Sequence, residues 1–352
     1  MKTPWGSRSP ASVALLLPVL VAIAVLALAS CGGTSTTASS SPSVASSQVA
    51  ASPSVAASPS GIPLPTPTVA GTIAFERVVT PGDEGGNGDI YVVNADGTGL
   101  RPLAEAPGWE EHPSWSPDGR RIVYDVVAEG SNDPQDATIW VMNADGSGKV
   151  QLTKGAVRGI LPSWSLDGKQ IAFMRALGPE RFAVFVMNAD GSGLRRVTRP
   201  AAGTSPGLQA DLSPAWAPNG KILLLRLGQV FAVNPDGSGL VQLTKGENII
   251  WFAPSPDGKR IAVHYNNSDR VAVVPAHGGG TPVTLLGPIS DVIPDGPFAA
   301  PAWTPDGQAL AVASSSYEGF SGSRLYIVNA DGSRLSAVPG IDSAQDPAWR
   351  PR

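Results

Sequence analysis

The sequence lacks several features that would point to common classes of protein. It has a single cysteine, Cys31, so a disulfide within one chain is excluded and the fold depends on its apolar core. It has no basic stripe of the kind that a nucleic-acid surface needs, and its net charge is −4. Long helical patterns are also missing. The 40 glycines and 34 prolines instead favour many short strands joined by turns.

The N-terminus has the pattern of an export signal. Lys2 and Arg8 precede an uncharged apolar run from Ala11 to Ala29, and the run ends on the letters LASC. This ending resembles the lipobox of bacterial lipoproteins. The resemblance implies a signal peptide over residues 1–30 and acylation of Cys31. The alternative is an ordinary transmembrane helix, because the run is nearly long enough to span a bilayer.

Residues 31–69 are expected to form an acylated cysteine followed by a disordered tether. After Cys31 the segment consists of Ser, Thr, Ala, Pro, Val and Gly with one Gln and no charge, too few large apolar side chains to offset the entropy of ordering. Loss of the signal would change the net charge from −4 to −6. We therefore predict an exported protein anchored by Cys31 to the outer face of a bacterial membrane, either the cell membrane or the periplasmic side.

The rest of the chain repeats one motif. The first copy, HPSWSPDGRRIVYDV, begins at His112, and related copies are PSWSLDGKQIAF, PAWAPNGKILLL, APSPDGKRIAV and PAWTPDGQALAV. Ser-Pro-Asp-Gly favours a tight turn between antiparallel strands, since Pro fixes φ and Gly accepts a left-handed conformation. A second motif, NADG, alternates with the first and is another tight turn. Each repeat therefore predicts four strands, called A to D.

The C strands, such as Ile139 to Met142, are apolar on both faces. A sheet with apolar residues on both faces must be covered on both sides, most simply by neighbouring sheets, and radial stacking of four-stranded sheets is a β-propeller. We predict an all-β fold with a six-bladed propeller over residues 70–352. The domain opens on a B strand, TIAFERV, and ends on an A strand, DPAWRPR, so the last strand should complete the first blade and close the ring.

The alternating WSPDG and NADG motifs resemble the WD40-like repeats of TolB-type six-bladed propellers. The likeness covers essentially all of residues 70–352. The α/β domain that precedes the propeller in TolB has no counterpart in the sequence. Blade 5 departs from the pattern, with Pro254 at the tryptophan position and His277 at its outer turn. The resemblance implies a fold, but such propellers include binding proteins and enzymes alike.

The variable loops indicate where a site should lie. The A–B and C–D turns are short and nearly invariant, whereas the B–C and D–A loops on the opposite face are long and varied, which favours that face and its channel mouth. Two aromatic side chains among a few polar ones suit a small polar ligand or a peptide end. The candidate ligand-binding residues are Glu111, His112, Arg158, Asp211, Trp251, Phe298 and Asp346. The alternative is that these are loop residues with no ligand.

Catalytic and metal sites are less well supported. Ser205 lies in a G-x-S-x-G match without the strand–turn–helix setting of a nucleophile elbow. His112, His264 and His277 fall on distant blades or opposite faces, so they cannot share one zinc ion, and the repeated NADGSG is explained by its turn without calcium. We therefore expect no catalytic residue, no metal and no cofactor.

The predicted function is a lipid-anchored binding or scaffolding propeller, and a monomer. It would bind a protein, a peptide or a small polar ligand, contact the membrane through its lipid alone, and leave nucleic acid unbound. The alternative is an exported lyase or lactonase-like hydrolase with acidic residues at the mouth, which a carboxylate pair with a raised pKa would favour.

Overall fold

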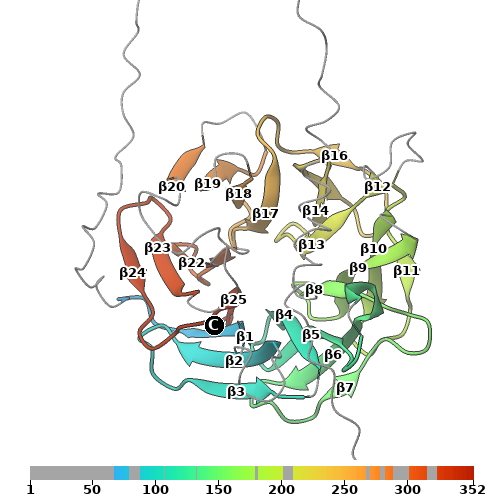
Figure 1. Cartoon of the computed structure of the whole chain (residues 1–352). Helices are drawn as coiled ribbons and strands as arrows, with labels where there is room; N and C mark the ends of the chain where they lie inside the picture. Colours follow the sequence, from blue (N-terminus) through green and yellow to red (C-terminus); the bar gives the residue numbers. More distant parts are fainter. Residues whose placement is uncertain are drawn as a thin grey trace, which may run out of the picture.

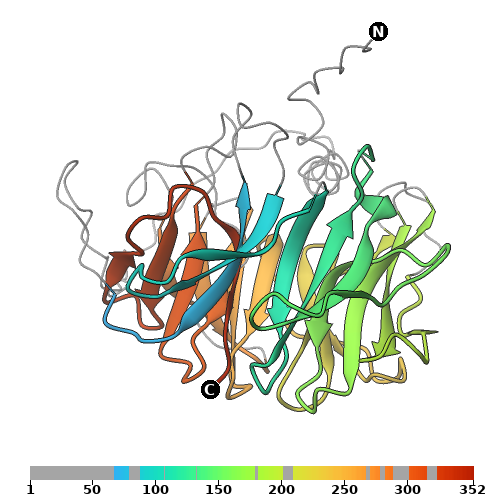
Figure 2. The ribbon, with the colours of Figure 1, turned by 90° about the horizontal axis from the view of Figure 1, so that it is seen from below.

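The computed structural model describes residues 67–78, 88–106, 108–131, 133–178, 181–200, 209–266, 270–277, 282–287, 301–314 and 323–352. These residues form six antiparallel sheets arranged as a ring around a central axis (Figure 1). Seen from the side, the strands run roughly along the height of the ring (Figure 2). One short helical turn, η3 (Pro134–Asp136), is described. No helix in the described ranges has the length and apolar character needed to cross a membrane.

Each blade contains an A, a B, a C and a D strand, in order from the channel outwards. Blade 1 consists of β25 (Gln345–Trp349), β1 (Thr72–Val78), β2 (Gly88–Asn94) and β3 (Arg101–Ala104). Blade 2 consists of β4 (Trp109–Trp115), β5 (Arg121–Val127), β6 (Thr138–Asn143) and β7 (Val150–Gln151). Blade 3 consists of β8 (Ile160–Trp164), β9 (Gln170–Gly178), β10 (Arg181–Asn188) and β11 (Arg195–Arg196).

The other three blades follow the same order. Blade 4 consists of β13 (Leu212–Trp216), β14 (Ile222–Arg226), β15 (Gln229–Val233) and β16 (Val241–Gln242). Blade 5 consists of β17 (Ile249–Pro254), β18 (Arg260–Tyr265), β19 (Arg270–Pro275) and β20 (Val283–Leu286). Blade 6 consists of β21 (Ala302–Trp303), β22 (Ala309–Ala313), β23 (Leu325–Asn329) and β24 (Leu335–Ala337). A further strand, β12 (Gln209–Ala210), pairs in parallel with β10, which the repeats did not predict.

The two repeated motifs form the turns that the sequence predicts. In the first, the amide of Gly119 donates to the carbonyl of Ser116 at 2.8 Å, and Gly119 has φ of 63°. In the second, the amide of Asn143 donates to the carbonyl of Ser147 at 2.8 Å. Gly146 in that turn has φ of 90°, and a Cβ there would lie 2.7 Å from the carbonyl oxygen of Leu103 in the neighbouring blade. Glycine is thus required both for conformation and for blade packing.

The core lies between blades. Both faces of the B and C strands are buried, as at Ile122 to Tyr124 and Ile171 to Phe173. The buried residues fall into clusters that combine neighbouring blades, for example Val123 and Ile139 of blade 2 with Trp164 and Phe173 of blade 3. The apolar pattern on both strand faces is therefore explained by radial stacking, as predicted.

The last strand closes the ring. β25 pairs with β1 in antiparallel register, with Ala348 opposite Ala74 and Trp349 opposite Ile73. The amide of Arg350 also donates to the carbonyl of Thr72 at 2.9 Å. The predicted completion of blade 1 by the C-terminal strand is confirmed. Blade 5 is also a regular four-stranded sheet despite Pro254. Cys31, the tether, Ser205 and Phe298 lie outside the described residues.

Candidate functional site

The A strands bend at one repeated position near the channel mouth. The residue before the proline has a left-handed φ in four blades: His112 (52°), Leu161 (55°), Ser213 (49°) and Asp346 (44°). The strand register shifts at each of these positions, as in a β-bulge. Because four unlike side chains adopt the same bend, the bend is a property of the repeated backbone and does not depend on the side chain. The chemistry of the site depends instead on which side chains occupy it.

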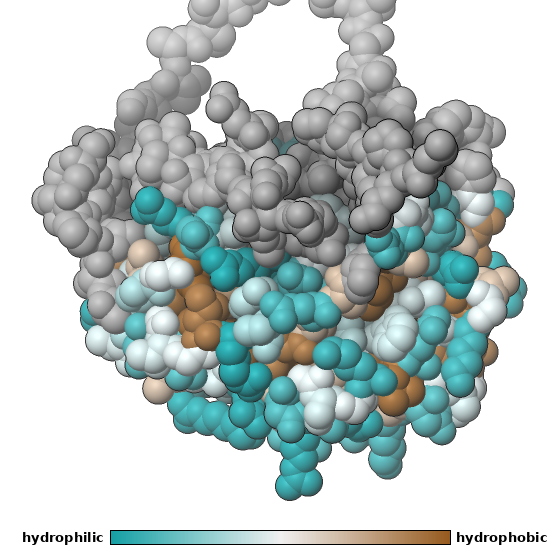
Figure 3. Space-filling model, turned by 60° about the horizontal axis from the view of Figure 1, so that its bottom comes forward, coloured by the Kyte–Doolittle hydropathy of each residue, from teal (hydrophilic) through white to brown (hydrophobic). Residues whose placement is uncertain are grey.

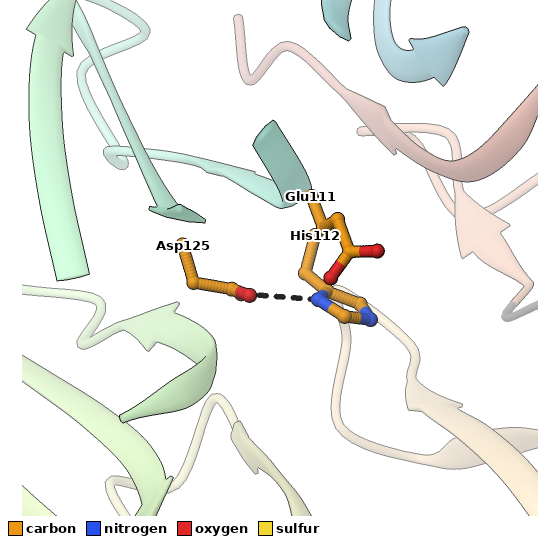
Figure 4. Close-up of side chains that lie close together, drawn as sticks. All are labelled: Glu111, His112 and Asp125. Atoms are coloured by element: carbon orange, nitrogen blue, oxygen red, sulfur yellow. Dashed lines mark hydrogen bonds and ion pairs between the residues drawn. The ribbon is translucent and has the colours of Figure 1, made fainter. Parts of the chain in front are cut away.

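Blades 1 and 2 place an imidazole among carboxylates at this position (Figure 4). Nδ1 of His112 lies 3.0 Å from Oδ1 of Asp125, and the same oxygen accepts a hydrogen bond from the backbone amide of Leu161 at 3.1 Å. Nε2 of His112 lies 3.7 Å from Oδ2 of Asp346. Glu111, His112 and Asp125 each offer a nitrogen or oxygen atom within 4.8 Å of the others. We call Glu76, Glu111, His112, Asp125 and Asp346 the mouth cluster.

The mouth cluster is largely removed from water. Glu76, Glu111 and Asp125 are 3%, 6% and 0% exposed, while the side chains of His112 and Asp346 keep 13% and 12%. Burial raises the pKa of Glu111 to about 8, with Asp125 and Asp346 adding to the increase and His112 opposing it. Burial and the neighbouring Glu111 also raise the pKa of Glu76 well above its usual range. The cluster therefore combines several acids in a small, weakly solvated volume.

The carboxylates of the cluster raise the pKa of His112. Burial alone would lower this pKa, but the charge and hydrogen bond of Asp125, together with Asp346 and Glu111, hold it well above its usual value. His112 is thus stabilised as a cation by its neighbours. The two residues with partial exposure, His112 and Asp346, are the ones that a bound group would meet first.

A second pair of carboxyls lies beside the cluster. Asp89 begins β2 and Glu110 lies in β4, next to Glu111 but with its side chain on the other face of the strand. Burial raises the pKa of Asp89 to about 6 and that of Glu110 to about 8, and a side-chain hydrogen bond joins them. Two buried carboxyls in contact favour sharing one proton, since both charges would repel in a low dielectric.

A comparison of the blades shows that the mouth cluster departs from the repeat. The cross-strand pair Glu111–Asp125 of blade 2 corresponds to Ile160–Met174 in blade 3 and Leu212–Leu225 in blade 4, and to Gln345–Glu76 in blade 1. The position that is apolar and buried in blades 3 and 4 thus holds two buried acids in blade 2, and in blade 1 it holds the buried acid Glu76 opposite the half-buried Gln345. Sequence reasoning identified Glu111, His112 and Asp346 but missed Glu76 and Asp125. An alignment of the B strands against one another would have singled out both.

The other predicted residues lie apart from the mouth cluster. Asp211 is fully buried in blade 4, where Arg226 donates to its two oxygens at 2.6 and 2.9 Å. Arg158 is partly exposed and donates to the carbonyl of Gly155 at 2.6 Å. Trp251 is half-buried on β17, opposite His264. Phe298 lies outside the described residues, so the structure groups three of the seven candidates.

Sequence and structure comparisons relate this ring to known proteins. Residues 74–229 match the TolB beta propeller domain. A search of the curated proteins found no match. Among solved structures, TolB from Acinetobacter baumannii has a TM-score of 0.65 at 19% identity, over 80% of this chain and 67% of that one. A chain of a nidogen/laminin complex has a TM-score of 0.59 at 11% identity, over 80% of this chain and 98% of that one.

An enzyme is also among the similar structures. The S511A mutant of puromycin hydrolase, complexed with PGG, has a TM-score of 0.50 at 17% identity. The match covers 77% of this chain and 46% of the hydrolase. At these identities the likeness shows the propeller fold alone, and the function of this chain has to be argued from its site.

Proposed function

We propose, from the premise that the chain carries a TolB-type six-bladed β-propeller, that it is a binding or scaffolding module whose partner is held at the channel mouth. TolB-like propellers suggest protein binding, and the rigid ring presents its mouth residues from β4, β5, β25 and β1 rather than from one flexible loop. A site built on strands keeps its geometry before the partner arrives, which reduces the entropic cost of binding.

The observation that carries this proposal is the partly exposed carboxylate of Asp346 in the mouth cluster. An incoming group meets the side chains of Asp346 and His112 first, since the other three members are almost fully buried. A partly exposed carboxylate favours a cationic donor, and a peptide amine or a basic side chain has that chemistry. The partner class that fits best is therefore a protein or peptide that presents a basic group.

Among the described residues, the face that carries the A–B and C–D turns offers no competing site, which supports a partner at the channel mouth. Its turn residues satisfy one another: Oγ of Ser116 donates to Asp118 at 2.6 Å, and Oγ of Ser147 donates to Asp145 at 2.6 Å. On the outer wall of the ring, which Figure 3 shows, apolar side chains are scattered among hydrophilic ones, without a single large apolar patch on the described surface. Isolated apolar residues of this kind are normal on a soluble surface and need no partner.

The proposal includes the location of the protein. An acylated Cys31 would anchor the chain to the outer face of a bacterial membrane, and residues 32–69 would act as a flexible tether. A flexible chain of this length has an end-to-end distance of roughly 30–40 Å. The ring and its mouth would thus be free to meet a partner away from the lipid surface.

A peptide-display experiment tests the site. The full-length protein in detergent is presented with random peptides that have either free or acetylated N-termini, and affinities of the selected peptides are measured for wild type, Asp346→Asn and the turn-face control Leu166→Ser. We expect basic or free-amine peptides, at least tenfold weaker binding for Asp346→Asn, and no change for Leu166→Ser. Equal affinity of all three proteins would place the partner elsewhere.

A second candidate is an exported hydrolase or lyase. Two observations favour it: the His112–Asp125 contact of 3.0 Å with the carboxyl of Glu111 close by, and the Asp89–Glu110 pair with its raised pKa values of about 6 and about 8, because such groups can move protons. Turnover of ester, lactone and uronate substrates by wild type that is lost in Glu111→Gln or Glu110→Gln and kept in the turn-face variant Leu166→Ser would support this candidate. If the wild-type protein turns over none of these substrates, the enzyme candidate is rejected and the binding module is retained.

A further inference from the structure

We propose that Glu111, His112 and Asp125 form a binding site for a divalent first-row transition metal ion such as Zn²⁺ or Mn²⁺. This site is independent of the proposed partner, because the ion would bind in the absence of any partner. It also replaces the expectation of no metal, which considered a zinc site shared by the three histidines and a calcium site in the NADGSG turns, and no site that combines one histidine with carboxylates.

The geometry of the three residues is close to that of a metal site. Their ligand atoms all lie within 4.8 Å of one another. Two ligands that are each about 2.1 Å from one ion lie at most roughly 4.2 Å apart, so small side-chain rotations bring the three together. Asp346 approaches the same imidazole from the side of Nε2, at 3.7 Å.

Two buried oxygens lack a partner in the described structure. Oε2 of Glu111 and Oδ2 of Asp125 are shielded from solvent and accept no hydrogen bond from described residues, although their residues are 6% and 0% exposed. A buried carboxylate oxygen without a partner costs free energy, and native proteins almost always satisfy such atoms. Both oxygens belong to the group that surrounds His112, where a cation would satisfy them together.

The hydrogen bonds of the cluster leave these oxygens available. Oδ1 of Asp125 is held by His112 and by the backbone amide of Leu161, so this carboxylate is oriented while Oδ2 stays open. A carboxylate that fixes the ring of a neighbouring histidine is a common feature around protein metal ions. The chain has therefore positioned the side chains before an ion binds.

A comparison of the repeated blades gives an independent reason to place a metal ion in blade 2. In blades 3 and 4 the same cross-strand position is filled by Ile160 with Met174 and by Leu212 with Leu225, so the fold requires no charge there. Replacing such a pair by two buried acids costs several kcal/mol per ionised group unless a counter-charge is present. Asp346 adds a further carboxylate, 3.7 Å from the other ring nitrogen of His112. A divalent ion would supply a positive charge to the buried carboxylates of Glu111 and Asp125.

The ligand types define the class of ion. One imidazole with two carboxylates suits Zn²⁺, Mn²⁺ or Fe²⁺. Ca²⁺ prefers six to eight oxygen ligands and Mg²⁺ an octahedron rich in water, so both should bind this set more weakly. Soft ions such as Cu(I) need the thiolates that the cluster lacks.

Thermal melts and calorimetry test the site directly. Full-length protein with a histidine-free affinity tag is stripped with chelator, and its Tm and heat of binding are measured with Zn²⁺, Mn²⁺, Ca²⁺ and Mg²⁺. With free Zn²⁺ or Mn²⁺ a hundredfold above Kd, we expect Tm to rise by about 5 °C. The affinity should fall at least tenfold in Glu111→Gln and in His112→Asn.

Two matched variants control for other binding. Glu110→Gln removes a buried carboxyl one residue away that points to the other face of β4, and His277→Asn removes an exposed imidazole; both should keep the full metal-dependent shift. Glu111→Gln should fold at least as stably as wild type without metal, since it removes a buried acid, so loss of its shift reports on the site. No shift in wild type, an unchanged shift in Glu111→Gln, or a larger shift with Ca²⁺ would overturn the proposal.

Discussion

The indole Nε1 of Trp115 donates a hydrogen bond to the main-chain oxygen of Ala348, 3.1 Å away, although 233 residues separate them in sequence. Trp115 belongs to blade 2 and Ala348 to the C-terminal strand of blade 1. The same contact recurs between Trp303 of blade 6 and Ala253 of blade 5, at 3.0 Å. In these two blades the tryptophan of the repeated motif therefore links a blade to the one before it, whereas the buried indole nitrogens of Trp164, Trp216 and Trp349 have no hydrogen-bond partner among the described residues.

Deletion of residues 346–352 should destabilise the protein strongly. It removes β25 except for its first residue, Gln345, and with it the acceptor for Trp115 and the buried Trp349, and it exposes β1 as an unpaired edge beside the channel. It also removes Arg350, which stacks over Trp115 and donates to the carbonyl of Gly119 at 2.9 Å. We expect a Tm at least 10 °C lower or a failure to fold, measured by circular dichroism.

A shorter deletion provides the control. Removal of residues 351–352 leaves β25 intact and loses an exposed ion pair between Arg352 and Asp306, which contributes little. The Tm of this variant should stay within a degree or two of wild type. Equal stability of the long deletion and wild type would show that the last strand does not close the ring.

The fold was predictable because its signals repeat. Five copies of each of two turn motifs define strand number and order, and the incomplete repeats at the two ends of the ring predict the pairing of β25 with β1. Two features carried no such signal. β12 depends on a parallel pairing inside a variable connection. The regularity of blade 5 despite Pro254 follows from backbone hydrogen bonding, since the edge strand β17 faces the channel and needs no outward donor at that position.

Trp251 and Phe252 should respond differently to replacement by alanine. Phe252 is 6% exposed and packs in the core that joins blades 3 to 5, so its loss should cost about 3–5 kcal/mol. Trp251 is half-buried and lies outside the described core clusters, so its loss should cost about 1–2 kcal/mol. Chemical denaturation measures both. A larger loss for Trp251→Ala would make this side chain part of the core instead of the mouth.

The ion pair of Asp211 and Arg226 should be coupled. Asp211 is fully buried and Arg226 is 20% exposed, so Asp211→Ala leaves a partly desolvated guanidinium without its carboxylate. We expect a loss of about 2–3 kcal/mol, below the value for a fully buried pair because water reaches the arginine. The double variant Asp211→Ala, Arg226→Ala should lose less than the sum of the single variants. Additive losses in urea melts would show that the pair does not stabilise blade 4.

The turn aspartates should make stability depend on acid pH. A hydrogen bond from Ser116 and the amide of Arg120 hold the pKa of Asp118 below its usual 3.8. A lowered folded pKa stabilises the protein above pH 3.8, and this contribution is lost as pH falls through the folded value. Asp118→Asn should therefore lower Tm by about 1–2 °C at pH 7, with the difference vanishing once the pH is below the folded pKa of Asp118. A difference that persists at low pH would assign the effect to geometry rather than charge.

The site was less predictable than the fold because its residues come from two ends of the chain. Position within the A strand was enough to select Glu111, His112 and Asp346. Glu76 and Asp125 lie on B strands, where buried apolar residues are expected, and their burial as charges depends on contacts between blades. Asp211 lies directly before the A strand β13 and was selected as a neighbour of these positions, yet Arg226 donates to both its oxygens, which only the side-chain geometry reveals.

Cys31→Ser should release the protein from the membrane. The prediction depends on the letters LASC after the apolar run, because a thioether-linked and acylated cysteine requires the thiol that serine lacks. A single acyl chain gives marginal binding, so stable anchoring depends on the several chains of a lipoprotein modification. Fractionation of cells that express wild type and the variant, with mass spectrometry of the mature N-terminus, measures the outcome. A variant that stays in the membrane fraction with its signal removed would contradict lipidation, and one that stays there with the signal intact would favour the apolar run as a transmembrane anchor.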